Sequence, residues 1–132
     1  MSMSVEQFLS LSDTEQLQTI KDLNDIGQEE IIIDVLTGVG IDNLSAPLLG
    51  ELGRAYNNND KPEEAIKVFK AIDKKYRDAV WYYRCAYSYG SIVSSNREAY
   101  TSENMQQMLA LVDNGVQLAT KEGRNDIREY CF

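Results

Sequence analysis

A pattern of large and small apolar residues returns in this chain after 33 residues, and no other feature restricts its fold as much. In the clearest copy, residues 46–78, the first half carries residues spaced as on one face of a helix: Leu49, Leu52, Gly53 and Tyr56. Residues 57–60 are a polar turn cluster, and residues 64–72 continue as a second amphipathic segment. A unit of this length holds one antiparallel helix pair, which buries its apolar face only against neighbouring units. The period therefore predicts an all-α chain of stacked helical hairpins.

The same segment predicts how its two helices join and pack. Asp60 stands where the N-cap of the second helix is expected, with Pro62 in the first turn and Glu63 placed to close a capping box. Gly53 and Ala65 are expected to face each other, because small residues let two helices approach closely.

Two weaker copies flank this repeat. Residues 79–121 repeat the pattern of the first helix at Tyr82, Cys85, Ala86 and Tyr89, and a polar stretch at 93–102 then predicts an inserted surface loop. Residues 13–45 are a degenerate copy, in which Gln16 and Thr19 depart from the apolar pattern. We therefore expect one domain over residues 1–132, with hairpins at 13–45, 46–78 and 79–121.

The periodicity places the helices near residues 13–25, 28–38, 46–57, 61–73, 79–92 and 103–121. A short capping helix is expected over Ser4–Leu9, and Lys121 with Gly123 is typical of the end of the last long helix. Ile127, Tyr130 and Cys131 mark one face of a partial C-terminal helix over 125–132. The prediction is about seven or eight helices and no β-sheet.

The repeat resembles the tetratricopeptide repeat (TPR) family. Its matching positions are Leu49, Leu52, Gly53, Tyr56, Ala65 and Phe69, whereas Ile72 is larger than the residue usual at its position. The resemblance covers about residues 13–119, and the segments Arg54–Asn58 and Trp81–Arg84 also look like small bacterial TPR proteins. It implies a right-handed helical-repeat solenoid of helix–turn–helix hairpins that binds a protein or peptide in a concave groove.

The resemblance also implies which side chains line that groove. The residues at the matching positions are Arg54, Asn57, Tyr83, Arg84 and Tyr87. Aromatic and Arg side chains often anchor interfaces, although the two tyrosines would serve equally to cover the next helix. The chaperone-binding TPR subclass grips a C-terminal carboxylate. Here Arg84 matches its Arg, but Val80 and Arg54 replace its Lys and Asn, so we infer no chaperone-tail binding.

Acidic residues are concentrated in the first third of the chain. The formal net charge is −8; residues 1–45 hold nine acidic residues against Lys21 alone, while twelve acidic and twelve basic residues cancel over 46–132. Such a field repels nucleic acid and favours a basic protein surface. The candidate acidic surface comprises Asp13, Glu15, Asp22, Asp25, Glu29 and Glu30. The alternative is a solvated hairpin whose charge serves solubility.

Several residue types that enzymes and metal sites need are missing. The chain has no His, which excludes His-dependent triads and His-ligated metals, and Cys85 and Cys131 cannot form a structural zinc site alone. Gly38-Val39-Gly40 lacks the rest of a phosphate-binding loop. Glu29-Glu30 and Glu63-Glu64 fall in first turns of helices, where carboxylates offset the helix dipole. We therefore expect no enzymatic activity, no cofactor and no metal.

The function expected from these patterns is protein binding. No signal peptide or membrane span is visible, which predicts a cytoplasmic protein that contacts neither membrane nor nucleic acid. The first interpretation is a non-catalytic interaction module or adaptor that uses the groove and the acidic N-terminal hairpin. The alternative is an immunity protein that neutralises a basic toxin domain by direct binding. Neither the partner nor the oligomeric state follows from the sequence.

Overall fold

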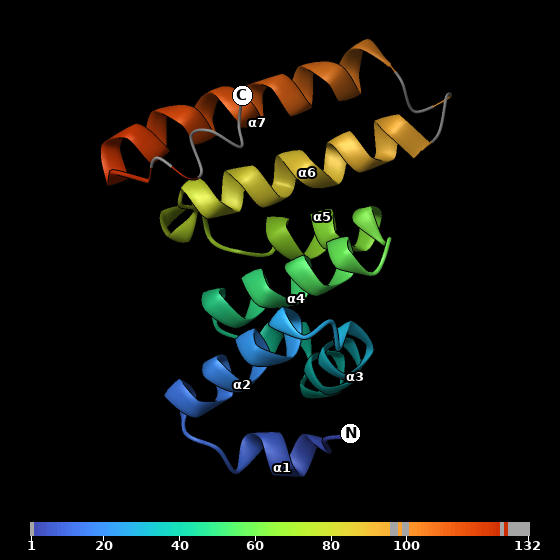
Figure 1. Ribbon diagram of the computed structural model, residues 1–132, viewed down its shortest axis with the longest axis vertical. Coiled ribbons are helices and arrows are strands. Elements are labelled where there is room, and N and C mark those ends of the chain that lie inside the picture. The colour runs from blue at the N-terminus through green and yellow to red at the C-terminus, as the bar shows by residue number, and fades with distance from the viewer. Residues whose placement is uncertain (1, 96–97, 99–100, 125, 127–132) are drawn as a thin grey trace. The chain divides into compact units, whose positions relative to one another are not determined.

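The computed structural model describes residues 2–95, 98, 101–124 and 126 (Figure 1). Over these residues the chain is all-α, with seven α-helices, two short 3₁₀ helices and no strand. It divides into two compact units, residues 1–71 and 72–132. The predicted repeat 46–78 runs across this division, and the single domain over 1–132 stays a prediction. None of the helices in the described part of the chain is long and apolar enough to cross a membrane.

The first unit contains three successive layers of short helices. Its elements are α1 (Val5–Leu9), α2 (Asp13–Asp25), α3 (Glu29–Val39), η1 (Ile41–Asn43), α4 (Ala46–Asn58) and α5 (Pro62–Lys70). Helix α4 packs against α2, α3 and α5, and the five-residue α1 packs against α3. The most completely buried large side chains come from every α-helix of this unit: Phe8, Ile20, Ile32, Leu36, Leu52, Val68 and Phe69.

Helices α4 and α5 approach closely at Gly53. A Cβ atom at this position would overlap the ring of Phe69, so glycine is what makes room for the aromatic side chain. Phe69 and Ala65 are both completely buried, one turn apart on α5. The sequence predicted that Gly53 lies opposite Ala65. The close contact at Gly53 is instead with Phe69.

The turn between α4 and α5 corrects the predicted cap. The N-cap of α5 is Lys61, which makes no side-chain cap bond, so Asp60 is not the N-cap and Glu63 closes no capping box. Asp60 instead has φ of +60°, the left-handed conformation that Asp tolerates. The Lys61 N–H donates to the Tyr56 carbonyl, which closes the C-terminus of α4. Pro62 lies in the first turn of α5, as predicted, and is its first residue.

The first two helices each begin with a capping box, which the sequence analysis did not predict. Ser4 with Gln7 caps α1, and Ser12 with Glu15 caps α2. The backbone N–H of Ser12 donates to the Glu15 carboxylate, and this bond is the main reason why the pKa of the carboxyl lies below its ordinary value of 4.5. A bond between Glu15 and the Ser12 hydroxyl lowers the pKa further. The ionised carboxylate is therefore the form that the capping box stabilises.

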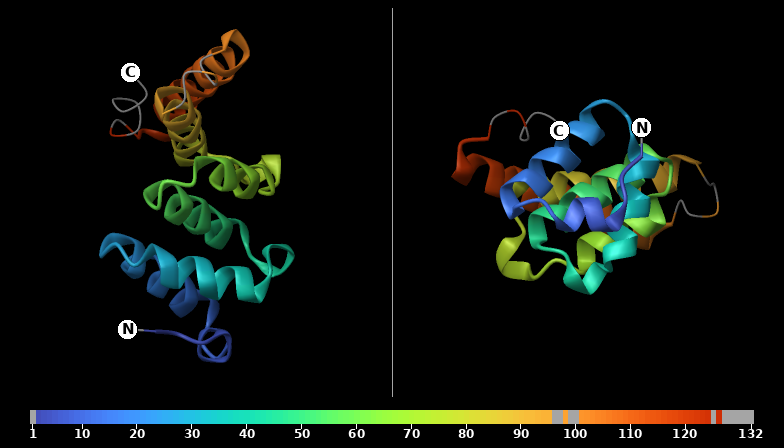
Figure 2. Two further views of the ribbon diagram at one scale, coloured as in Figure 1. Left: turned by 90° about the vertical axis from the view of Figure 1, so that its right-hand side faces the viewer. Right: turned by 90° about the horizontal axis from the view of Figure 1, so that it is seen from below.

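The second unit is a hairpin of two long helices. Its elements are η2 (Lys74–Tyr76), α6 (Ala79–Ser95) and α7 (Ser102–Glu122), and Figures 1 and 2 show α6 and α7 side by side. Ala79 and Ala119 are completely buried between them, with partly buried apolar side chains packed around: Val80, Tyr83, Val112, Val116 and Leu118. The carboxylate of Glu122 accepts the N–H of Ala79 at 3.3 Å.

The helix bounds confirm the predicted pattern with a few corrections. Helix α2 is as predicted, α3 is shifted by one residue at both ends, and α4 is one residue longer, but α5 covers Pro62–Lys70 rather than residues 61–73. Helix α6 continues to Ser95, so the predicted loop 93–102 begins later, and Val93 is buried rather than exposed. Gly123 ends α7 with φ of +70°, as predicted. The predicted helix over 125–132 lies outside the described residues, apart from Asp126.

Candidate protein-binding site

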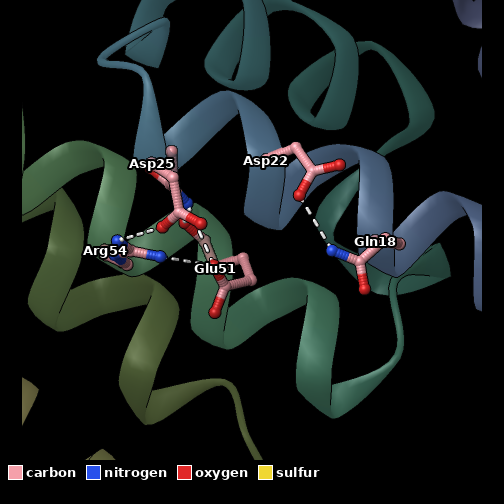
Figure 3. A network of polar contacts seen from close by, with 6 residues as sticks. Gln18, Asp22, Asp25, Glu51 and Arg54 are labelled. Carbon is pink, nitrogen blue, oxygen red and sulfur yellow. Dashed lines mark hydrogen bonds and ion pairs between the residues drawn. The ribbon is translucent and has the colours of Figure 1, made fainter.

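A polar network lies between α2 and α4 in the first unit (Figure 3). Arg54 of α4 is at its centre, with Nη2 3.0 Å from Asp25 Oδ1 and Nη1 3.2 Å from Glu51 Oε1. Asp25 is at the last turn of α2, and Glu51 is one turn before Arg54 on α4. The guanidinium therefore bridges the two helices through a carboxylate from each.

The buried side of this network is formed by Asn24 and Glu51. Asn24 Nδ2 donates to the backbone oxygen of Glu51 at 3.0 Å and to its Oε1 at 3.2 Å, and each residue is only 4% exposed. Reversing the amide would point Asn24 Oδ1 at two acceptors, so these bonds fix its orientation. In this orientation Asn24 Oδ1 is buried and has no hydrogen-bond partner among the residues that the structure describes. The contact therefore combines charge pairing with one unsatisfied acceptor.

Arg54 is held in its charged form. Burial lowers the pKa of the guanidinium, but hydrogen bonds and charge from Asp25 and Glu51 outweigh this effect, and the net pKa is raised. Because its side chain is 31% exposed, Arg54 is still partly accessible to a partner. Arg54, the first of the predicted groove residues, thus lies in an ion-paired network, which leaves its guanidinium fewer N–H donors for a ligand.

The remaining predicted groove residues lie on two helices. Asn57 is half-buried on α4, one turn after Arg54, whereas Tyr83, Arg84 and Tyr87 are on α6 in the second unit. Tyr83 packs against the apolar cluster around Ala79 and Ala119, so part of its ring covers the neighbouring helix α7. Tyr87 is 52% exposed and is the most accessible aromatic of the set. Because the two groups belong to different units, a common groove stays a prediction.

The predicted acidic surface is exposed on the α2–α3 hairpin. Asp13, Glu15, Asp22, Asp25 and Glu30 are exposed, and Glu29 is half-buried. Some of these carboxylates have local bonds: Asp22 Oδ1 accepts from Gln18 Nε2 at 2.8 Å, and Asp25 pairs with Arg54 (Figure 3). These bonds leave the carboxylates at the surface, where they contribute to the local negative field.

Two features were missed at the sequence level. Asn24 and Glu51 interrupt the apolar faces of α2 and α4, since each lies among buried neighbours, and a polar residue in such a stripe indicates a buried polar contact. The second is a basic segment: residues 67–77 hold five basic residues and Asp73 as the only acidic one. The local charge count would have identified it.

No metal site is apparent: in the described part of the chain no three Cys, Asp or Glu side chains are grouped to hold an ion. Cys85 is a buried thiol on α6, only 1% exposed. Searches of protein-family models, of curated proteins and of solved structures find no match to this chain. We therefore infer function from the charge, burial and contacts of the chain itself.

Proposed function

We propose that the chain is a TPR-like helical-repeat module that binds a basic protein surface through its acidic N-terminal hairpin and a groove. The spacing of the helices supports the repeat interpretation. Helices α2, α4 and α6 begin at Asp13, Ala46 and Ala79, so the 33-residue sequence period is also the period of the helix starts. Helices α3 and α5 begin 33 residues apart too, at Glu29 and Pro62.

The turns within the hairpins repeat in the same register. Gly27 and Asp60 are 33 residues apart, and both take the left-handed conformation. In each turn the next N–H donates back to the helix that ends there, from Gln28 to Leu23 and from Lys61 to Tyr56. A right-handed solenoid of such hairpins is the arrangement that we propose.

The charge distribution is the observation that supports the binding function most strongly. Residues 1–45 carry a net charge of −8, and the acidic side chains of the α2–α3 hairpin are mostly exposed. A concentrated field of one sign steers a partner of opposite sign and raises its association rate. Tyr87 and Arg84 supply aromatic and cationic side chains of the kind that hold a partner after encounter. We propose no catalytic step.

The partner and the surface that it covers can be found in one experiment. The protein, carrying a photo-crosslinker at Asp34 or at Thr120, is exposed to extract from its source cells, and the adducts are identified by mass spectrometry. Both positions are exposed, on α3 and on α7 respectively. A basic protein captured from position 34 and not from position 120 supports the proposal. Capture of acidic proteins only, or equally from both positions, would contradict it.

A second candidate function is neutralisation of a basic toxin domain, with the chain as its immunity protein. The same charge asymmetry favours it, because an acidic surface can cover a basic active site. A toxic basic protein encoded beside this chain should be inhibited by it in a one-to-one complex, and co-expression should restore cell growth. Unchanged toxicity despite stoichiometric complex formation would exclude this function and leave the adaptor interpretation intact.

A further inference from the structure

The turn that precedes α6 is basic and exposed. Over residues 67–77 the bases are Lys67, Lys70, Lys74, Lys75 and Arg77. The 3₁₀ helix η2 presents Lys74, Lys75 and Tyr76 to solvent, and Tyr76 is 58% exposed. The Lys75 ammonium lies 5.0 Å from the centre of the Tyr76 ring. The Tyr76 ring at the surface is thus bordered by the Lys75 ammonium, and Lys74 is exposed two residues before it.

Neighbouring side chains shape this turn. The Asp73 carboxylate accepts the backbone N–H of Lys75, and Arg77 donates to the Ile72 carbonyl while stacking 4.4 Å from the Trp81 ring centre. Lys74 and Lys75, by contrast, form no ion pair with any residue that the structure describes. Among the described residues, therefore, neither exposed ammonium group is neutralised by a direct ion pair.

The same chain carries a surface of complementary chemistry at the α2–α3 turn. Ile26 is 62% exposed there, and Asp22 and Glu30, four residues before and after it in the chain, are exposed as well. An apolar centre with a charged rim is the usual composition of a protein interface, and here the two rims have opposite signs. We propose that the basic η2 turn of one copy docks on the acidic α2–α3 turn of a second copy.

Charge favours a second copy over a nucleic acid as the occupant. The chain's net charge of −8 opposes a polyanion, which is charged along its whole length, and it also opposes a second copy. In a second copy, however, the negative charge is confined to residues 1–45, and residues 46–132, which hold the basic turn, have no net charge, so the basic turn can approach the acidic turn without repulsion between like-charged segments. Because exposed ion pairs contribute little individually, the association should be weak and strongly dependent on salt. The inference uses the acidic surface of the proposed function, but the basic turn plays no part in that function.

Sedimentation velocity over a concentration series tests the proposal. The wild-type protein should self-associate at about 0.01 M salt and be monomeric at about 1 M, where the Debye length falls from about 30 Å to about 3 Å. The double variant K74E/K75E should associate at least about tenfold more weakly than wild type. The matched control K61E/K121E makes the same change in net charge at two exposed lysines outside the basic turn. Because it keeps the docking contact, its association should weaken only by the effect of the added negative charge, and less than that of K74E/K75E.

Mixing variants isolates the specific contact. The variant D22K/E30K loses the acidic turn and K74E/K75E loses the basic turn, so neither should self-associate, but a mixture should form a complex that retains one intact contact. A wild-type protein that stays monomeric at low salt, or a mixture that fails to associate, would overturn the proposal. The proposal would also be overturned if K74E/K75E associated as strongly as the control. Binding of wild type to a single-stranded oligonucleotide instead of to itself would overturn it too. Each of these results leaves crosslinking of a basic partner at Asp34 unaffected, so failure here is distinguishable from failure of the proposed function.

Discussion

Helix α4 makes two kinds of contact in the first unit, and they differ in chemistry. Toward α5 it is apolar, with Gly53 under the Phe69 ring. Toward α2 it includes a polar network in which Arg54 pairs with Asp25 and Glu51, and Asn24 bonds to Glu51. Apolar packing stabilises in proportion to the area buried, whereas a buried polar contact adds little net energy but penalises any arrangement that leaves its members unpaired. The first contact thus supplies stability, and the second favours one pairing of helices.

The largest expected effect tests the apolar contact. Phe69→Ala removes a completely buried ring and leaves a cavity above Gly53, so the free energy of unfolding should fall by about 3–5 kcal/mol. Urea denaturation measures it. Leu109→Ala, at a side chain that is 58% exposed, is the control and should change the value by less than about 0.5 kcal/mol. Equal effects of the two substitutions would mean that the α4–α5 contact is not a core.

The polar contact should respond less, and in a way that depends on what replaces Glu51. Glu51→Ala removes a buried acceptor from both Arg54 and Asn24 and should cost about 1.5–3 kcal/mol. Glu51→Gln keeps the shape and one acceptor, so it should cost less. Urea denaturation of both variants measures these losses. If Glu51→Ala leaves the free energy of unfolding unchanged, the network does not stabilise the pairing of α2 with α4.

The exposed half of the network should contribute least to stability. Asp25 has a side chain that is 65% exposed, so Asp25→Asn should lower the free energy of unfolding by less than about 1 kcal/mol. This loss should shrink further in about 1 M salt, where exposed pairs are screened. If Asp25→Asn costs as much as Glu51→Ala, the division into buried and exposed halves is wrong.

Much of the fold could be predicted from the sequence because helix periodicity is local. The ends of α2 and α4 follow from apolar spacing and from Gly27 and the 57–60 turn cluster, all within one hairpin. Asp60 was misassigned because an Asp between two helices fits either an N-cap or a left-handed turn, and only the geometry of the turn distinguishes them. The bond between Asn24 and Glu51 could not be predicted, since it joins residues 27 apart that meet only after α2 and α4 pack.

The smallest effect concerns the capping box of α2, at the start of the acidic hairpin. The pKa of Glu15 is lowered in the folded state, so its contribution to stability is complete above the ordinary value of 4.5 and is lost as pH falls through the lower folded value. Glu15→Gln should therefore melt below wild type at neutral pH, and the two melting temperatures should converge in acid. Melting curves at neutral pH and near pH 3 check this; a difference that stays constant would show that the charge of Glu15 is not involved.

The association rate with a basic partner tests the central claim most directly. Asp22→Asn with Asp34→Asn removes two exposed charges that Arg54 does not use, and the association rate should fall at low salt and approach wild type as salt rises. Tyr87→Ala should instead raise the dissociation rate, by the equivalent of about 1–3 kcal/mol if the ring is a binding anchor. Surface plasmon resonance at two salt concentrations separates the two rates. An association rate for the Asp22/Asp34 variant equal to wild type at low salt would contradict the claim and leave the acidic hairpin a solubility feature.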